Sequence, residues 1–147
     1  MGHEVNYHEL AQTIGNINTM AVEKYLDLLE KTYVIFKLPA YSRNLRNEIK
    51  KGKKCYFFDN GIRNVLISDF KQPKMRFDKG APWENYLVSE RLKRNAYHQN
   101  HPNTYFWRTH DQAEIDYIEE QDGLLKAYPN HQTRVIHREI FKSFVLP

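Results

Sequence analysis

The sequence predicts a mixed α/β fold of the α+β class, in which an N-terminal winged helix-turn-helix precedes a small mixed sheet with flanking helices. Two observations predict it. In the first part, two short helical patterns joined at Gly15 lead into two strand-like runs around a basic stretch. In the second part, a helical run from Trp83 leads into aromatic-rich strands. We therefore expect a winged helix-like domain over residues 1–70 and an α/β domain over residues 71–147.

Composition narrows the class of protein. A length of 147 residues suits one ordinary domain or two small ones. Hydrophobic residues make up 41% of the chain, which excludes a disordered protein, and 27% charged residues with only short apolar runs exclude a membrane protein. The single Cys55 has no internal disulfide partner, which fits a reducing compartment. We expect a cytoplasmic protein without a membrane partner.

The first helix has clear end signals. Asn6 with Glu9 three residues later forms a capping box, and Gly15 is a typical residue after a helix end. Thr19 is predicted to cap the second helix. That helix has apolar residues at positions i, i+3, i+4 and i+7, namely Val22, Tyr25, Leu26 and Leu29.

The rest of the first part reads as strands and a short helix. Strands are expected over 33–38 and 54–58, and a short helix over 62–67, after the turn signal Asp59-Asn60-Gly61. The polar stretch 71–82 contains Pro and Gly, so we place the domain boundary there.

A basic cluster lies between the two predicted strands. Residues 43–54 contain one acid, Glu48, and six cations, namely Arg43, Arg46, Lys50, Lys51, Lys53 and Lys54. The cluster could neutralise phosphates of DNA, or it could be a solvated hairpin tip. The second predicted helix carries three acids, Glu23, Asp27 and Glu30, and this disfavours base reading by that helix.

Glu84 is a candidate catalytic and metal-binding residue. The helix predicted over 83–95 places Glu84 on one stripe with Leu87, Val88 and Leu92, at i, i+3, i+4 and i+8. A carboxylate on a packing face is costly unless it is paired or binds a metal. The alternative is a first-turn glutamate favoured by the helix dipole.

Asp116 is the second candidate. Residues 114–118 are predicted to form a strand, and period two puts Glu114, Asp116 and Ile118 on one face. Aspartate is disfavoured inside strands, so either metal binding or an exposed edge position would explain it. Mg²⁺ binds one or two carboxylates together with substrate phosphates, and Glu84 and Asp116 would suit that task.

The motifs, taken in order, resemble a family along nearly the whole chain. The matching segments are Glu9-Leu10-Ala11, residues 22–30 (VEKYLDLLE), residues 54–61 (KCYFFDNG), Trp83-Glu84-Asn85, Trp107-Arg108 and Glu114-Ile115-Asp116. They resemble the C-terminal region, labelled a domain of unknown function, that follows the ATPase module in a prokaryotic group of AAA+ proteins. The resemblance implies a winged helix joined to a PD-(D/E)XK nuclease-like domain. It also implies that Glu84 is the helix acid of that fold and Asp116 its strand acid.

The chain departs from the family pattern in two places. No Walker A loop is found, so ATP would bind only through an ATPase module that this chain lacks. The expected Glu-x-Lys strand is also missing, and a segment of roughly 15 to 25 residues is expected to be absent between Leu125 and Lys126. Pro129 and His131 stand nearest to the places of that Glu and Lys, so the chain as written is expected to be inactive.

Two functions remain open at this stage. The first is an accessory C-terminal region of a AAA+-type ATPase that binds DNA or cleaves it with Mg²⁺. The second is a non-catalytic module for contact with protein or nucleic acid.

Overall fold

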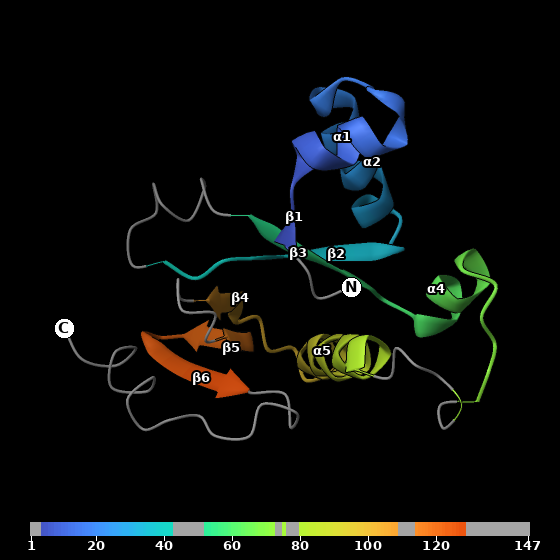
Figure 1. Ribbon diagram of the computed structural model, residues 1–147. Helices are drawn as coiled ribbons and strands as arrows, with labels where there is room; N and C mark the ends of the chain where they lie inside the picture. The colour runs from blue at the N-terminus through green and yellow to red at the C-terminus, as the bar shows by residue number, and fades with distance from the viewer. Residues whose placement is uncertain (1–3, 43–51, 73–74, 76–79, 109–113, 129–147) are drawn as a thin grey trace.

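The structure, a computed structural model, describes residues 4–42, 52–72, 75, 80–108 and 114–128. Within these ranges the chain has a mixed α/β fold with four helices and two antiparallel sheets. Helices α1 (Tyr7–Gly15) and α2 (Thr19–Lys31) lie on one side of the first sheet, and α5 (Gly80–Tyr97) lies on the other (Figure 1). The α/β class is as predicted. The winged-helix and nuclease-like assignments stay predictions.

Both N-terminal helices begin at an asparagine. The side chain of Asn6 accepts hydrogen bonds from the backbone N–H groups of His8 (3.0 Å) and Glu9 (3.3 Å), as the sequence predicts. For α2 the cap is Asn18, whose side chain accepts from the Met20 N–H at 2.8 Å. The prediction of Thr19 as the cap is therefore wrong by one residue. Asn18 has the extended backbone that a cap requires, whereas Thr19 is already helical.

The first sheet consists of β1 (Glu4–Val5), β2 (Ile35–Pro39) and β3 (Lys53–Phe57), in the antiparallel order β1-β3-β2. An ion pair holds α2 against this sheet. The ammonium of Lys37 contacts Asp27 and lies 2.9 Å from Glu30 Oε2. Two of the acids that give α2 its negative face are thus engaged by β2.

Helix α4 (Asn60–Leu66) is capped by Asp59, so the turn signal in the sequence marks a helix start. Helix α5 begins at Gly80, three residues before the predicted start. Its predicted stripe does face the core: Val88 is buried, and Leu92 packs against the main core cluster.

The second sheet consists of β4 (Asn103–Arg108), β5 (Glu114–Gln121) and β6 (Leu124–Tyr128), in the antiparallel order β4-β5-β6. The β5–β6 hairpin turns at Asp122 and Gly123, both with positive φ (53° and 75°). Such a two-residue turn favours the Asp-Gly pair found here. The seam predicted between Leu125 and Lys126 lies inside β6, where both residues pair with β5.

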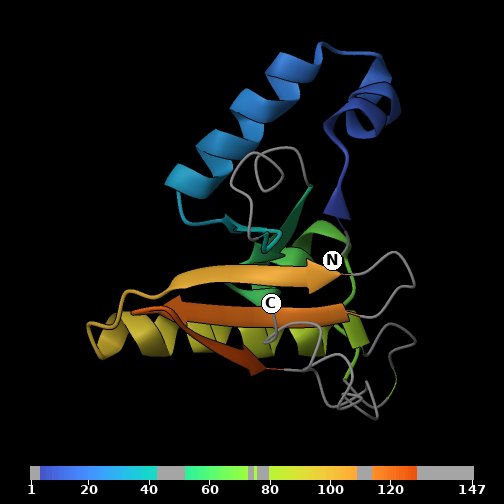
Figure 2. The ribbon, with the colours of Figure 1, turned by 90° about the vertical axis from the view of Figure 1, so that its left-hand side faces the viewer.

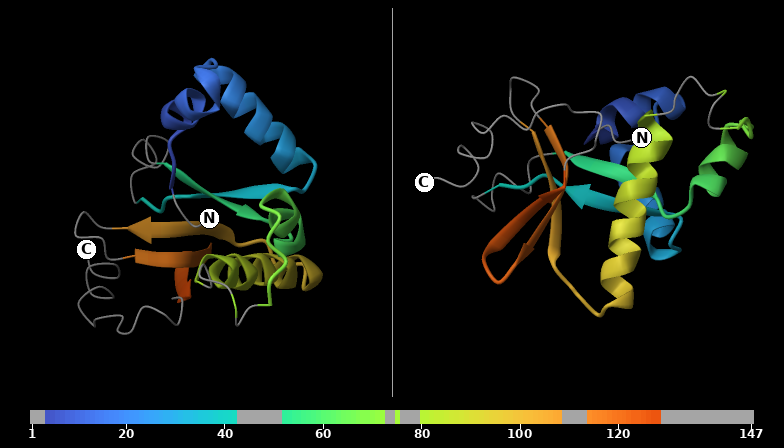
Figure 3. Two further views of the ribbon diagram at one scale, coloured as in Figure 1. Left: turned by 45° about the vertical axis from the view of Figure 1, so that its right-hand side comes forward. Right: turned by 90° about the horizontal axis from the view of Figure 1, so that it is seen from below.

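The two sheets meet where β2 ends. Ala40 forms a parallel bridge with Phe106 of β4, and the Tyr41 N–H donates to the Phe106 carbonyl at 2.6 Å. One core cluster spans both sheets and α5, with the buried residues Phe36, Leu38, Ala40, Tyr56, Val88, Phe106 and Tyr117. Figure 2 shows α5 running beside the second sheet, and Figure 3 shows it from below against the strands of both sheets. The domain division predicted at residue 70 stays a prediction, and this core draws on residues from both sides of it.

None of the helices in the described ranges has the length and apolar character needed to cross a membrane.

Candidate functional site

Four charged side chains from three elements meet at the junction of the two sheets. Lys54 comes from β3, Glu84 from the first half of α5, and Glu114 and Asp116 from the start of β5. The structure therefore brings together the two acids singled out in the sequence, although 32 positions separate them. We call this group the Lys54 cluster.

The Lys54 ammonium is the centre of the cluster. Its Nζ atom contacts Glu114 Oε1, lies 3.2 Å from Asp116 Oδ1, and lies 3.6 Å from Glu84 Oε1. The Lys54 side chain is only 2% exposed, whereas the acids retain between 14% and 28% exposure. The acids are thus the water-facing part of the cluster, and the cation is its buried part.

The position of Lys54 follows from strand periodicity. Lys54 and Tyr56 are two residues apart on β3, so both point to the same buried face. The Tyr56 hydroxyl donates to Glu84 Oε1 at 2.7 Å. One face of β3 therefore supplies both of the donors that hold the Glu84 carboxylate.

Asn85 fixes the helix that carries Glu84. Its fully buried amide accepts from the Phe57 N–H at 2.8 Å and donates to the Phe57 carbonyl at 2.9 Å and to Asn60 Oδ1 at 2.9 Å. The side chain thus pairs with β3 as a neighbouring strand would, and it ties α5 to the start of α4. Sequence reasoning did not assign this role, although Asn85 lies in the Trp83-Glu84-Asn85 motif.

A β-bulge sets the direction of the β5 side chains. Tyr105 of β4 pairs with Ile118 of β5, and Trp107 pairs with Ile115. Between these two pairs β5 therefore has one residue more than β4. The extra residue breaks strict alternation, so the predicted grouping of Ile118 with Glu114 and Asp116 on one face is wrong. Instead, Ile115 and Ile118 share a separate core cluster. The Asp116 side chain is only 14% exposed and contacts Lys54, which does not fit an exposed position.

The charges of the cluster shift one another. Burial alone would lower the pKa of Lys54, but Glu114, Asp116 and Glu84 outweigh it, and the pKa is raised. Burial raises the pKa of Glu84, and the neighbouring Asp116 raises it further, against the opposing effects of Tyr56 and Lys54. Burial, together with the Glu84 carboxylate, also raises the pKa of the Tyr56 hydroxyl. At neutral pH the cluster thus holds a charged lysine beside Glu84, whose carboxyl group resists ionisation.

The predicted Mg²⁺ site at Glu84 and Asp116 stays a prediction, and in the structure these two carboxylates lie beside the Lys54 ammonium. Mg²⁺ requires near-octahedral oxygen ligands at about 2.0 to 2.1 Å. In the Lys54 cluster the carboxylates converge on an ammonium, which occupies the position that a cation would need. In the described ranges no three acidic, histidine or cysteine side chains are placed so that they could hold a metal ion. As arranged, the cluster is a buried ion-pair group.

The six cations of the basic cluster, residues 43–54, do not form one described group. Arg43, Arg46, Lys50 and Lys51 lie outside the described residues, as do Pro129 and His131. Lys53 is half-buried on β3, on the strand face opposite to Lys54. Lys54 itself is enclosed by the acids. Its alternation with Tyr56, a large apolar residue, was the signal in the sequence that it points inward.

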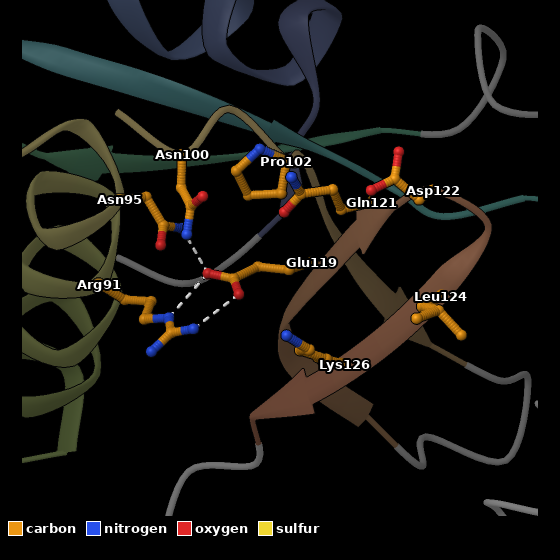
Figure 4. Close-up of a pocket in the computed structure, with 9 residues that line it drawn as sticks. All are labelled: Arg91, Asn95, Asn100, Pro102, Glu119, Gln121, Asp122, Leu124 and Lys126. Atoms are coloured by element: carbon orange, nitrogen blue, oxygen red, sulfur yellow. Dashed lines mark hydrogen bonds and ion pairs between the residues drawn. The ribbon is translucent and has the colours of Figure 1, made fainter. Parts of the chain in front are cut away.

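A second ion pair joins α5 to the second sheet. The Arg91 guanidinium donates to the buried Glu119 carboxylate from Nε and Nη2, both at 2.7 Å. Asn95 donates to Glu119 Oε1 at 2.5 Å, and the Tyr128 hydroxyl donates to Oε2 at 3.1 Å. Arg91, Asn95 and Glu119 border a hollow between α5 and the β5–β6 hairpin (Figure 4).

Comparisons with known proteins place two family models on the chain. Residues 1–73 match a domain of unknown function (DUF8612), and residues 79–144 match another domain of unknown function (DUF4143). Relatives include the uncharacterized protein Rv2008c of Mycobacterium tuberculosis and the uncharacterized protein Mb2031c of Mycobacterium bovis. Each is 30% identical over 118 residues, which are 78% of this chain and 25% of the relative. The match thus spans about a quarter of the length of these relatives. No solved structure matches the chain.

Proposed function

We propose that this chain is a non-catalytic accessory region of a prokaryotic AAA+-type ATPase, and that it contacts DNA phosphates without cutting the DNA. The observation that carries the non-catalytic part is the position of Lys54. Its ammonium lies among the acids that a nuclease-like fold would use for Mg²⁺. In this proposal the acids join α5, β3 and β5 instead of activating water.

The link to an ATPase rests on the family match and on length. The domain of unknown function that matches residues 79–144 is often a C-terminal region of ATPase proteins. The relatives are much longer than the segment that this chain matches. An accessory region also needs a surface for the rest of its protein. Tyr25, Leu28 and Leu29 on α2 are 62%, 48% and 40% exposed, and they would supply an apolar one.

DNA contact is supported by charge. The chain carries a formal net charge of +4, and residues 43–54 contain five cations besides Lys54. A group of Lys and Arg side chains binds phosphates without reading sequence, and the acids of α2 disfavour base reading. We therefore expect DNA binding that depends on salt and shows little sequence preference.

One assay tests both parts of the proposal. Supercoiled plasmid is incubated with the full chain in Mg²⁺ or Mn²⁺, and mobility shift and nicking are read from the same gel. We expect a shift that weakens as salt rises, with nicking no faster than in buffer. Reversing the charges in a Lys50→Glu/Lys51→Glu variant should reduce the slope of log affinity against log salt by about two or more. A Lys24→Glu/Lys31→Glu variant on α2 is the matched control for total charge.

The second candidate function is a Mg²⁺-dependent nuclease, favoured by the convergence of Glu84 and Asp116. It predicts metal-dependent nicking that Asp116→Ala abolishes and Glu23→Ala, at an exposed position of α2, leaves unchanged. That result would overturn the non-catalytic proposal. A DNA shift that is indifferent to salt and to the Lys50/Lys51 reversal would overturn the proposed DNA contact.

A further inference from the structure

We propose that the hollow between α5 and β6 is a binding site for a small phosphate-bearing ligand. It lies at the end of α5 away from Glu84 and is separate from the Lys54 cluster. Two adjoining hollows, of about 340 and 490 Å³, share Arg91, Asn95, Asn100 and Lys126. These volumes fall in the range of sites for small ligands, about 300 to 1,000 Å³. Below we call the larger one the Arg91 hollow.

The positive charge of the Arg91 hollow favours an anionic ligand. Within the described part of the chain, this hollow is lined by the cations Arg91, Arg94 and Lys126 and by the histidine His98, and by no carboxylate. The remaining lining groups, Asn95, Asn100 and Tyr128, carry amide or hydroxyl groups that can donate hydrogen bonds. Three cations beside neutral donors fit the oxygens of a phosphate group.

Glu119 holds Arg91 in place. Glu119 lines the smaller of the two hollows and not the Arg91 hollow. It binds Nε and Nη2 of Arg91 at 2.7 Å each, and the Arg91 guanidinium lies over the Tyr128 ring at 4.2 Å from its centre. Arg91 is thus fixed before any ligand arrives, and its third nitrogen, Nη1, is not bound to Glu119. The pair is electrically balanced, so Arg94 and Lys126 supply the positive charge that the hollow has in excess.

The end of α5 opposes an anion only weakly. The C-terminal carbonyls of a helix carry partial negative charge. Here backbone N–H groups after the helix engage these carbonyls: His98 donates to Arg94, Gln99 to Ala96 and Asn100 to Asn95, at 2.9 to 3.1 Å. Arg94 in the last turn adds a full positive charge at the same place. The cations therefore outweigh the helix dipole.

A compact ligand suits the hollow better than a polymer backbone does. Arg91 is recessed, with only 22% of its side chain exposed, whereas Arg94 and Lys126 are exposed at the rim. A terminal phosphate can enter between the rim cations and reach Arg91. A phosphodiester within a strand would contact mainly the rim.

Titration calorimetry of the full chain with pyrophosphate at low salt tests the proposal. The test variant is Arg94→Gln/Lys126→Gln, which removes the two rim cations and leaves the buried Arg91–Glu119 pair intact. The matched control is Lys24→Gln/Lys31→Gln, which removes the same charge from α2. We expect the wild-type chain to bind, the test variant to bind about tenfold more weakly or worse, and the control to stay within about twofold.

Each outcome of the titrations either supports or overturns the site. Binding that is lost in the test variant and kept in the control supports the site. No binding of pyrophosphate by the wild-type chain, or equal weakening in both variants, overturns it. A short single-stranded oligonucleotide is titrated as a second probe, and if it alone binds through Arg94 and Lys126, the small-ligand proposal is overturned in favour of a nucleic-acid contact. Lys50→Glu/Lys51→Glu, which tests the proposed DNA contact, should leave pyrophosphate binding unchanged.

Discussion

At the scale of single residues, Lys54 is the cation that three acids share. Three carboxylates surround one ammonium, so the cluster would carry excess negative charge if all the acids were ionised. Burial and the neighbouring Asp116 raise the pKa of Glu84, which favours its neutral form and reduces that excess. The Tyr56 hydroxyl acts in the opposite direction, because it donates to Glu84 and stabilises the ionised carboxylate. Lys54 supplies the positive charge of the cluster, which the three acids cannot supply.

We predict that Lys54→Met lowers the free energy of unfolding by about 3 kcal/mol at pH 7, because it leaves three partly buried carboxylates without their cation. Urea denaturation of both proteins measures the change. Lys53→Met, at the half-buried neighbouring position on the opposite face of β3, is the control and should change stability by less than about 0.5 kcal/mol. Equal effects of the two substitutions would contradict the role given to Lys54.

The same variant should show a distinct dependence on pH. The pKa of Glu84 in the folded protein lies above 4.5, its ordinary value, so the folded state holds this proton more tightly than the unfolded state does. Stability from this group is therefore lost as pH rises through the folded pKa. Removing Lys54 takes away an influence that lowers this pKa, so the deficit of Lys54→Met should shrink between pH 7 and pH 4. A deficit that does not change with pH would indicate lost packing.

At the scale of elements, the sequence shows where a helix begins and which face of it is apolar. It does not show which strand residues lie opposite one another. The cap at Asn6 and the buried stripe of α5 depend on residues within two turns, and both are found in the structure. The bulge in β5 depends on which β4 residues lie opposite, and that is invisible in a single strand. Lys54 read as part of a basic run, because its three partners come from segments 30 to 62 positions away.

The β5–β6 hairpin carries a prediction of its own. Gly123 has a φ of +75° with nothing near the place of an added Cβ, so Gly123→Ala meets only backbone strain. We expect a loss of about 1 kcal/mol in the free energy of unfolding. Faster amide hydrogen exchange in β6 should accompany it. Asp122→Asn, which keeps a residue that tolerates positive φ, should have little effect. Unchanged exchange in Gly123→Ala would contradict the assigned turn.

At the scale of the whole molecule, one core holds together segments that match two different family models. Phe36, Leu38 and Tyr56 come from the segment that matches the first model, and Val88, Phe106 and Tyr117 come from the segment that matches the second. The Lys54 cluster divides in the same way, with its cation in the first segment and its acids in the second. Apolar burial and charge neutralisation both require that the two halves fold together.

We therefore predict that residues 1–75 alone do not form a stable unit. In this fragment the apolar face of β2 and β3 would be exposed to water, and the Lys54 ammonium on that face would lack its carboxylates. The full chain should unfold in one cooperative transition, because both segments contribute side chains to the same core. Tryptophan fluorescence and far-ultraviolet circular dichroism should then report the same midpoint. The fragment should show poorly dispersed amide resonances, and equimolar residues 76–147 should restore their dispersion. A well-dispersed fragment spectrum, or two separate transitions in the full chain, would mean that each segment folds on its own core.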